Sequence, residues 1–280
     1  WVDGPRVVAA AGVSVTGGHL DVDGMSSDML KVKSPETICD GPFECRKVTR
    51  EAIKYGADAI KVASTGGVLS DTNTGTGQQM RDDELKEIVD TAHSLGRKVA
   101  SHAHAAAGIN AALRAGVDSV EHASYANKES IRLFKKTGAY LVPTLLAGDT
   151  VVNMAKESEF MSPPIRAKAI KVGADMLKNF QRSYKAGVKI AFGTDSGVSR
   201  HGINAREAVL MYQAGMTTSD ILASATVNGA DLVGMNETLG TLEKGKFADI
   251  IAMNASPLKN IEALLDVDFV MKGGKVYKNK

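Results

Sequence analysis

The segment from Lys98 to Ala123 constrains the fold more than any other part of this 280-residue chain. Its sequence, KVASHAHAAAGINAALRAGVDSVEHA, predicts a strand over Val99–His104, a helix over Ala106–Arg114 and a second strand over Val117–His122. A strand–helix–strand unit with short connections is right-handed, and its two strands are parallel. The carboxyl ends of both strands therefore lie at one edge of the sheet, where α/β folds bind ligands.

Both predicted strands end in histidine. His102 and His104 close the first strand, and His122 closes the second. Residues two apart in a strand face the same side, so His102 and His104 point together. Three converging imidazoles suit zinc or a similar metal. A single histidine here would be interpreted as a polar cap on a strand end, but three at one edge favour a site.

The rest of the chain repeats this alternation of apolar strands and helices, which is typical of a parallel α/β fold. The six predicted strands cover Arg6–Thr16, Asp58–Ala63, Val99–His104, Val117–His122, Ala139–Leu146 and Val188–Asp195. The predicted helices cover Pro42–Tyr55, Asp82–Leu95, Ala106–Arg114, Lys128–Lys136, Pro164–Ala186, Ala205–Ala214 and Thr218–Leu232. A closed barrel needs two more strands. The alternative is a six-stranded doubly wound sheet, but no GxGxxG motif follows any strand.

The last part of the chain changes character. Short strands are predicted over Ala248–Met253, Val267–Lys272 and Gly274–Tyr277, joined by turns. These are too few strands for an independent unit. We therefore expect two domains, a barrel over residues 1–235 and a small β domain over residues 236–280.

The composition excludes several classes of protein. Apolar residues make up 44% and charged residues 24% of the chain, as in ordinary globular proteins. The formal net charge of +2 is nearly neutral, so the composition does not argue for a nucleic-acid or membrane partner. The two cysteines, Cys39 and Cys45, are expected to be reduced and structural. Residues Asp21–Glu36 are expected to be irregular, and the loop Ser64–Gln79, rich in turn residues, to be mobile and close to the active site.

Two further strand-end residues strengthen the case for a site. Lys61 lies inside an apolar strand, where an unpaired amine is costly. It is either paired with an acid such as Glu121 or chemically modified so that it serves as an anionic ligand. Asp195 ends the last barrel strand, where it either ligates a metal and accepts a proton or caps the next helix. His19 follows the first strand in the same way.

These residues lie in motifs that span nearly the whole chain in order: Thr16–His19, Gly56–Lys61, His102–His104, Gly116–His122, Gly193–Asp195 and Gly240–Asp249. With them the sequence resembles the amidohydrolase superfamily, and within it the imidazolonepropionase-like metallodipeptidases. Those enzymes are similar to prolidases and to carboxypeptidases that act on Xaa-Arg or Xaa-Lys dipeptides.

The resemblance implies a (β/α)8 TIM barrel, of which this sequence contains strands 3 to 8, and a small β-sandwich completed by the C-terminal strands. It implies two zinc ions bridged by a carboxylated Lys61. His102 and His122 would hold the second metal and Asp195 the first, while His19 and His104 would grip the substrate carboxylate. The family's first strand carries another His-x-His, which we expect to lie upstream of Trp1.

The carboxylation of Lys61 also has a physical motive. A cationic lysine facing histidines and divalent ions would be repelled, so its pKa should fall and expose a neutral amine that reacts with CO2. The resulting carbamate has two oxygens and could bridge two cations, as in other two-metal hydrolases.

We therefore expect a metal-dependent hydrolase that cleaves a peptide or amide bond next to a free carboxylate, with Asp195 as the proton acceptor. The alternatives are hydrolysis of a cyclic amide such as imidazolonepropionate, and a degenerate barrel that acts as a scaffold. Tyr125 and His201 are further candidates for the substrate pocket. We expect a small peptide substrate, no nucleic-acid or membrane partner, a homo-oligomer, and a cytoplasmic location.

Overall fold

The computed structural model describes residues 3–21, 37–70, 76–157 and 161–280. Most of the predicted irregular segment Asp21–Glu36 and the centre of the Ser64–Gln79 loop lie outside these ranges. Within them, no helix is long and apolar enough to cross a membrane.

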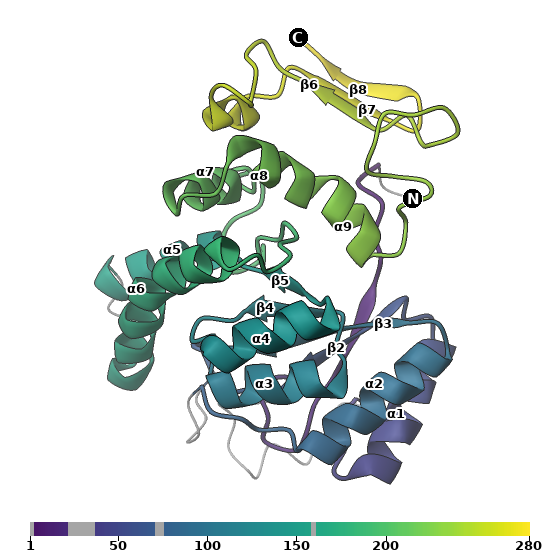
Figure 1. The fold of residues 1–280 in the computed structure, drawn as a ribbon, viewed down its shortest axis with the longest axis vertical. Coiled ribbons are helices and arrows are strands. Elements are labelled where there is room, and N and C mark those ends of the chain that lie inside the picture. The colour runs from purple at the N-terminus through teal and green to yellow at the C-terminus, as the bar shows by residue number, and fades with distance from the viewer. Residues whose placement is uncertain (1–2, 22–36, 71–75, 158–160) are drawn as a thin grey trace.

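A parallel sheet with the strand order β1-β2-β3-β4-β5 forms the centre of the structure (Figure 1). Its strands are β1 (Ala10–Val13), β2 (Ala59–Ala63), β3 (Lys98–Ala103), β4 (Ser119–His122) and β5 (Tyr140–Val142). Neighbours in the sheet are also neighbours along the chain, whereas a doubly wound sheet reverses its order partway. The sheet is therefore wound as in a TIM barrel, which confirms the predicted fold class.

Four helices cover one face of this sheet (Figure 1). They are α1 (Pro42–Lys54), α2 (Asp82–Ser94), α3 (Ala106–Ala115) and α4 (Lys128–Thr137). Gly116 and Gly138 end α3 and α4 in left-handed conformations, at φ 98° and 77°, which glycine adopts without a steric penalty. Ile60 and Val120 of the sheet are fully buried against helix residues such as Leu85 and Ile109. Each such burial stabilises the fold by about 1.5–3 kcal/mol.

Several predicted strands are shorter than expected, and the first, predicted over Arg6–Thr16, is reduced to Ala10–Val13. Pro143 ends β5, because proline has no N–H for the ladder, and α5 (Leu145–Glu157) follows where the sequence predicted more strand. The segment Val188–Asp195 forms only an isolated parallel bridge, from Ile190 to Leu141 of β5. Beyond it, Phe192 N–H donates to the carbonyl of Ser224 at 3.0 Å, so the backbone leaves the ladder.

The predicted reduced state of the cysteines is wrong. Cys39 and Cys45 form a disulfide with a Cα–Cα distance of 4.9 Å, and both are fully buried. Gly41, at φ 87°, turns the chain between them, and the first turn of α1 brings Cys45 back beside Cys39. The sequence spacing of the two cysteines did not by itself indicate that they lie close enough to form a disulfide.

The second half of the chain begins with a helical hairpin of α5 and α6 (Pro163–Lys185). Three shorter helices follow: α7 (Arg206–Gln213), α8 (Thr218–Ala225) and α9 (Val227–Leu232). The last two replace one predicted helix, which breaks at Thr226. Beyond them lies an antiparallel sheet of β6 (Ile250–Ala252), β7 (Phe269–Lys272) and β8 (Lys275–Asn279), with the 3-10 helix η1 (Ile261–Leu265) between its first two strands. Figure 1 shows this sheet apart from the parallel one.

Candidate metal centre

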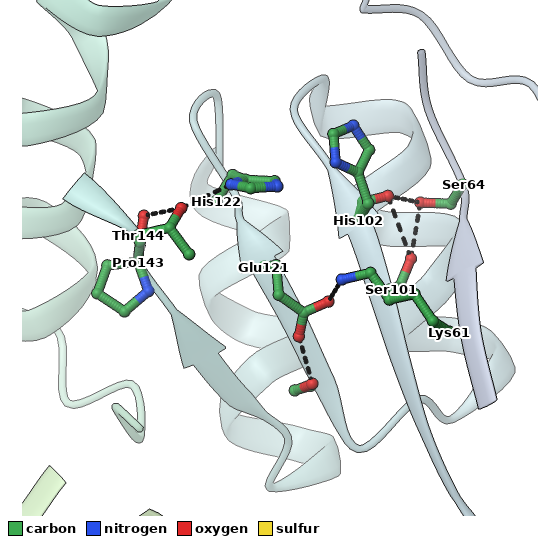
Figure 2. Close-up of polar contacts among 9 residues, drawn as sticks. Lys61, Ser64, Ser101, His102, Glu121, His122, Pro143 and Thr144 are labelled. Atoms are coloured by element: carbon green, nitrogen blue, oxygen red, sulfur yellow. Dashed lines mark hydrogen bonds and ion pairs between the residues drawn. The ribbon is translucent and has the colours of Figure 1, made fainter. Parts of the chain in front are cut away.

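The register of the parallel sheet brings two of the predicted histidines together. His102 of β3 lies opposite Glu121 of β4, and Ala103 lies opposite His122. The centroids of the His102 and His122 rings are 4.7 Å apart (Figure 2). The hydroxyls of Ser64 and Ser101 bond to each other at 3.0 Å and connect the chain after β2 to β3. The backbone ladder therefore sets the spacing of the two imidazoles.

His104 and His19 complete the cluster. The His104 ring lies 4.8 Å from the His102 ring and 4.9 Å from the His122 ring, between centroids. The ligand atoms of His102, His104 and His122 all lie within 4.8 Å of one another. His19 stacks obliquely on His102 at 4.2 Å, so four of the predicted site residues converge.

Hydrogen bonds orient each of these rings. His122 Nδ1 contacts Thr144 Oγ1 at 2.6 Å, and His104 Nδ1 contacts Ser124 Oγ at 2.7 Å. His102 Nε2 lies 3.3 Å from the carbonyl oxygen of Gly66, which can only accept. These partners hold the rings in place, as in known metal sites where the second nitrogen of each histidine is bonded to the protein.

The electrostatic environment favours neutral imidazoles. Burial and then the neighbouring histidines and Lys61 place the pKa values of His102 and His122 well below the ordinary range. Burial, with smaller effects from His19 and Lys168, lowers the pKa of His104 to about 3. Metal ions bind the unprotonated ring, so this donor set fits a divalent transition metal.

Lys61 of β2 lies beside this cluster and faces Glu121 (Figure 2). Its amine forms an ion pair with Glu121 Oε2, and Ser119 Oγ donates to Glu121 Oε1 at 2.5 Å. Of the two interpretations of Lys61, the structure shows the ion pair. A carbamate on Lys61 would have to move away from Glu121, because two anions repel each other.

Asp195 lies at the same cavity but does not cap a helix, since α7 begins only at Arg206 and has Ala205 as its N-cap. Its side chain is accessible to solvent, although the surrounding protein removes part of its hydration and raises its pKa. The carboxylate is therefore available to a ligand in the cavity.

A cavity of about 200 Å³ joins these residues. Its polar side is formed by His19, Lys61, His102, His104, His122 and Asp195. Its apolar side is formed by Leu20, Val68, Leu69, Ala147, Val151, Ala169, Val172, Met176 and Val198, with Gly148 and Gly173. Sequence reasoning missed this apolar side because it predicted a strand where α5 begins and gave the predicted helix Pro164–Ala186 no part in the site. Tyr125 and His201 do not line the cavity, and their contact with a substrate stays a prediction.

Residues with unusual backbone conformations lie in the same region as the cavity. Among the described residues, four that are not glycine have positive φ: His122 at 68°, Ala123 at 45°, Thr144 at 49° and Asp195 at 53°. His122 and Ala123 lie at and just after the carboxyl end of β4, Thr144 lies two residues after β5, and Asp195 lies beyond the isolated bridge at Ile190. Strained residues of this kind concentrate at functional sites. The sequence analysis singled out His122 and Asp195 but neither Ala123 nor Thr144. For Thr144, its position directly after Pro143, inside the apolar run Ala139–Leu146, is the signal that was available.

Comparison with known proteins gives the same family. A profile described as the Amidohydrolase family matches residues 3–277. The chain is 35% identical to an ochratoxinase from Aspergillus niger over 294 residues, which cover 98% of this chain and 60% of that protein. It is 26% identical to an imidazolonepropionase from Geobacillus thermodenitrificans over 207 residues, which cover 71% of this chain and 44% of the other.

The fold agrees with a solved structure. The crystal structure of a Xaa-Pro dipeptidase with bound methionine in its active site superimposes with a TM-score of 0.96 at 40% identity. The match covers 99% of this chain and 69% of that one. The chain thus spans about 60% of the length of the ochratoxinase and somewhat more of the dipeptidase.

Proposed function

Because the chain belongs to the amidohydrolase family, we propose that it hydrolyses a peptide or amide bond next to a free carboxylate, in a zinc-dependent reaction. One observation carries the proposal: Lys61 of β2, His102 of β3, His122 of β4 and Asp195, which lies beyond the bridge to β5, line one cavity. The Xaa-Pro dipeptidase likeness supports the same class of bond.

We assign the metal ligands as follows. His102 and His122 would hold one zinc ion, Asp195 would hold another, and a carboxylated Lys61 would bridge the two. The neutral state of the imidazoles fits this role. Zinc bound there would supply Lewis acidity, which polarises the scissile carbonyl and makes water more acidic.

The remaining chemistry belongs to the side chains of the chain itself. The accessible carboxylate of Asp195 would accept a proton from the attacking water and pass it to the leaving amine. His19 and His104 would hold the substrate carboxylate. Because its pKa is lowered to about 3, His104 is neutral at pH 7 and would contribute a hydrogen bond rather than a charge.

The apolar side of the cavity favours substrates with an apolar C-terminal residue over substrates with a basic one. Val151, Val172 and Met176 offer hydrocarbon surface, and Asp195 is the acidic residue among the side chains that line the cavity in the described part of the chain. With Asp195 assigned to zinc, an arginine or lysine side chain would lose hydration against this surface without gaining an acidic partner. A proline or another apolar C-terminal residue would gain about 0.8 kcal/mol per buried methylene. We therefore favour Xaa-Pro and related substrates over Xaa-Arg and Xaa-Lys.

A matched panel of substrates tests this function. The protein with added zinc is assayed against Ala-Pro, Ala-Phe, Ala-Arg and Ala-Lys, and in parallel against imidazolonepropionate. We expect hydrolysis of the first two and a lower kcat/KM for the two basic dipeptides. Ring opening of imidazolonepropionate without dipeptide hydrolysis would support the cyclic-amide alternative, and stoichiometric zinc would be unexpected for a scaffold.

A further inference from the structure

Thr144 has a conformation that its residue type disfavours. It follows Pro143 at the end of β5 with φ 49°, in the left-handed region where a β-branched residue is rare. Such a conformation costs about 1–3 kcal/mol and persists only where its surroundings enforce it. Thr144 is also buried, and its side chain does not line the cavity. It cannot touch the substrate from there, but it touches His122.

The hydroxyl of Thr144 has two partners, which together determine where its proton points. Thr144 Oγ1 lies 2.8 Å from the carbonyl oxygen of Pro143 and 2.6 Å from Nδ1 of His122 (Figure 2). A carbonyl only accepts, so the single hydroxyl proton goes to Pro143. The oxygen can then only accept from His122, whose Nδ1 must carry the ring proton. Nε2 of His122 is left with a free lone pair.

We propose that Thr144 is a positioning residue that fixes His122 in the Nδ1–H tautomer and so keeps Nε2 free to bind a metal ion. The inference rests on the metal site of the proposed function, but not on the identity of the substrate. The partners of a metal-binding histidine commonly set its tautomer in this way.

Glu207 supports Thr144 from the other side. It lies in the first turn of α7 and is fully buried. Its two carboxylate oxygens accept the backbone N–H groups of Leu145 at 2.9 Å and Leu146 at 2.7 Å. Those two peptides directly follow Thr144 and begin α5, so the carboxyl group holds the backbone that carries the strained residue. Glu207 is a second positioning residue, which acts through Thr144.

The test compares Thr144→Val with Thr144→Ser. Valine keeps the branched shape and the backbone strain but has no hydroxyl, whereas serine keeps the hydroxyl. We expect Thr144→Val to weaken zinc binding by about 10–100-fold, measured by competition with a chromogenic chelator. Thr144→Ser should stay within about threefold of the wild type. Glu207→Gln should weaken binding less than Thr144→Val does, since the glutamine carbonyl still accepts one of the two N–H groups.

A spectroscopic readout separates this role from a merely structural one. Nitrogen-15 NMR of the metal-free protein should show His122 as one tautomer, protonated at Nδ1, in the wild type and in Thr144→Ser. Thr144→Val should show a mixture, while its thermal unfolding stays close to that of the wild type. A single unchanged tautomer in Thr144→Val, or unchanged zinc affinity in a protein that binds zinc, would overturn the inference. Neither measurement uses a substrate, so a failure to hydrolyse dipeptides would count against the proposed function alone.

Discussion

The two sides of the cavity are built by different means. The polar floor includes Lys61, His102 and His122, which three neighbouring parallel strands hold in register. The apolar wall consists mainly of residues of α5 and α6, such as Val151 and Val172, which are held by side-chain packing. Under the proposed function the floor carries the groups that would bind metals and accept a proton, whereas the wall carries only apolar side chains and glycines. We therefore expect the sheet to fix the chemistry and the helical hairpin to select the substrate.

The largest effect is expected on the floor, at Lys61. Lys61→Ala should remove bound zinc and lower kcat/KM by roughly three orders of magnitude, about 4 kcal/mol. Lys61→Arg should rescue neither property, because a guanidinium cannot form the carbamate. Metal analysis and dipeptide assays check both variants, and short carboxylic acids should partly restore Lys61→Ala. Full zinc content and full rate in Lys61→Arg would show that the ion pair with Glu121 is the whole role of this lysine.

His104 distinguishes a metal ligand from a residue that binds the substrate. If it grips the substrate carboxylate, His104→Ala should raise KM by roughly 10–100-fold, since each charge-assisted hydrogen bond contributes about 1.5–3 kcal/mol. Zinc content should not change. The geometry also allows His104 to be a third ligand with His102 and His122, and in that case zinc would be lost together with the activity.

The disulfide affects the rigidity of the floor rather than its chemistry. Cys39 and Cys45 enclose Asp40, whose carboxylate accepts from Thr16 N–H at 3.2 Å and from Thr16 Oγ1 at 2.7 Å, three residues before His19. Replacing both cysteines with serine should lower the free energy of unfolding by about 2 kcal/mol, as the short loop predicts. Denaturant unfolding measures this. A loss of zinc content in the double variant would mean that the disulfide shapes the metal site directly.

The smallest effect is expected on the wall. Val172→Ala removes two methylene equivalents from the cavity, which should cost about 1.6 kcal/mol, or roughly tenfold in kcat/KM for Ala-Pro. Zinc content and the rate on a smaller substrate such as Ala-Gly should change little. A variant that lost zinc would contradict the separation of floor and wall.

The same contrast explains what could be predicted from the sequence. The floor was predictable because strand periodicity and βαβ handedness place residues such as His102 and His122 at one edge without any knowledge of packing. The wall was not, because α5 begins where an apolar run continues, and the hydrogen bonds from Leu145 and Leu146 to Glu207 that accompany this change come from distant sequence. The disulfide and the strained Thr144 depend on tertiary contacts that have no signature in local periodicity.

The central claim is that zinc held at the strand ends makes this chain a hydrolase. It is tested most directly by removing zinc with a chelator and returning it stepwise while the hydrolysis of Ala-Pro is followed. Activity should disappear with the metal, return in proportion to the zinc that binds, and not return in Lys61→Ala or His122→Ala. Full activity of the metal-free protein, or equal recovery in the two variants, would contradict it.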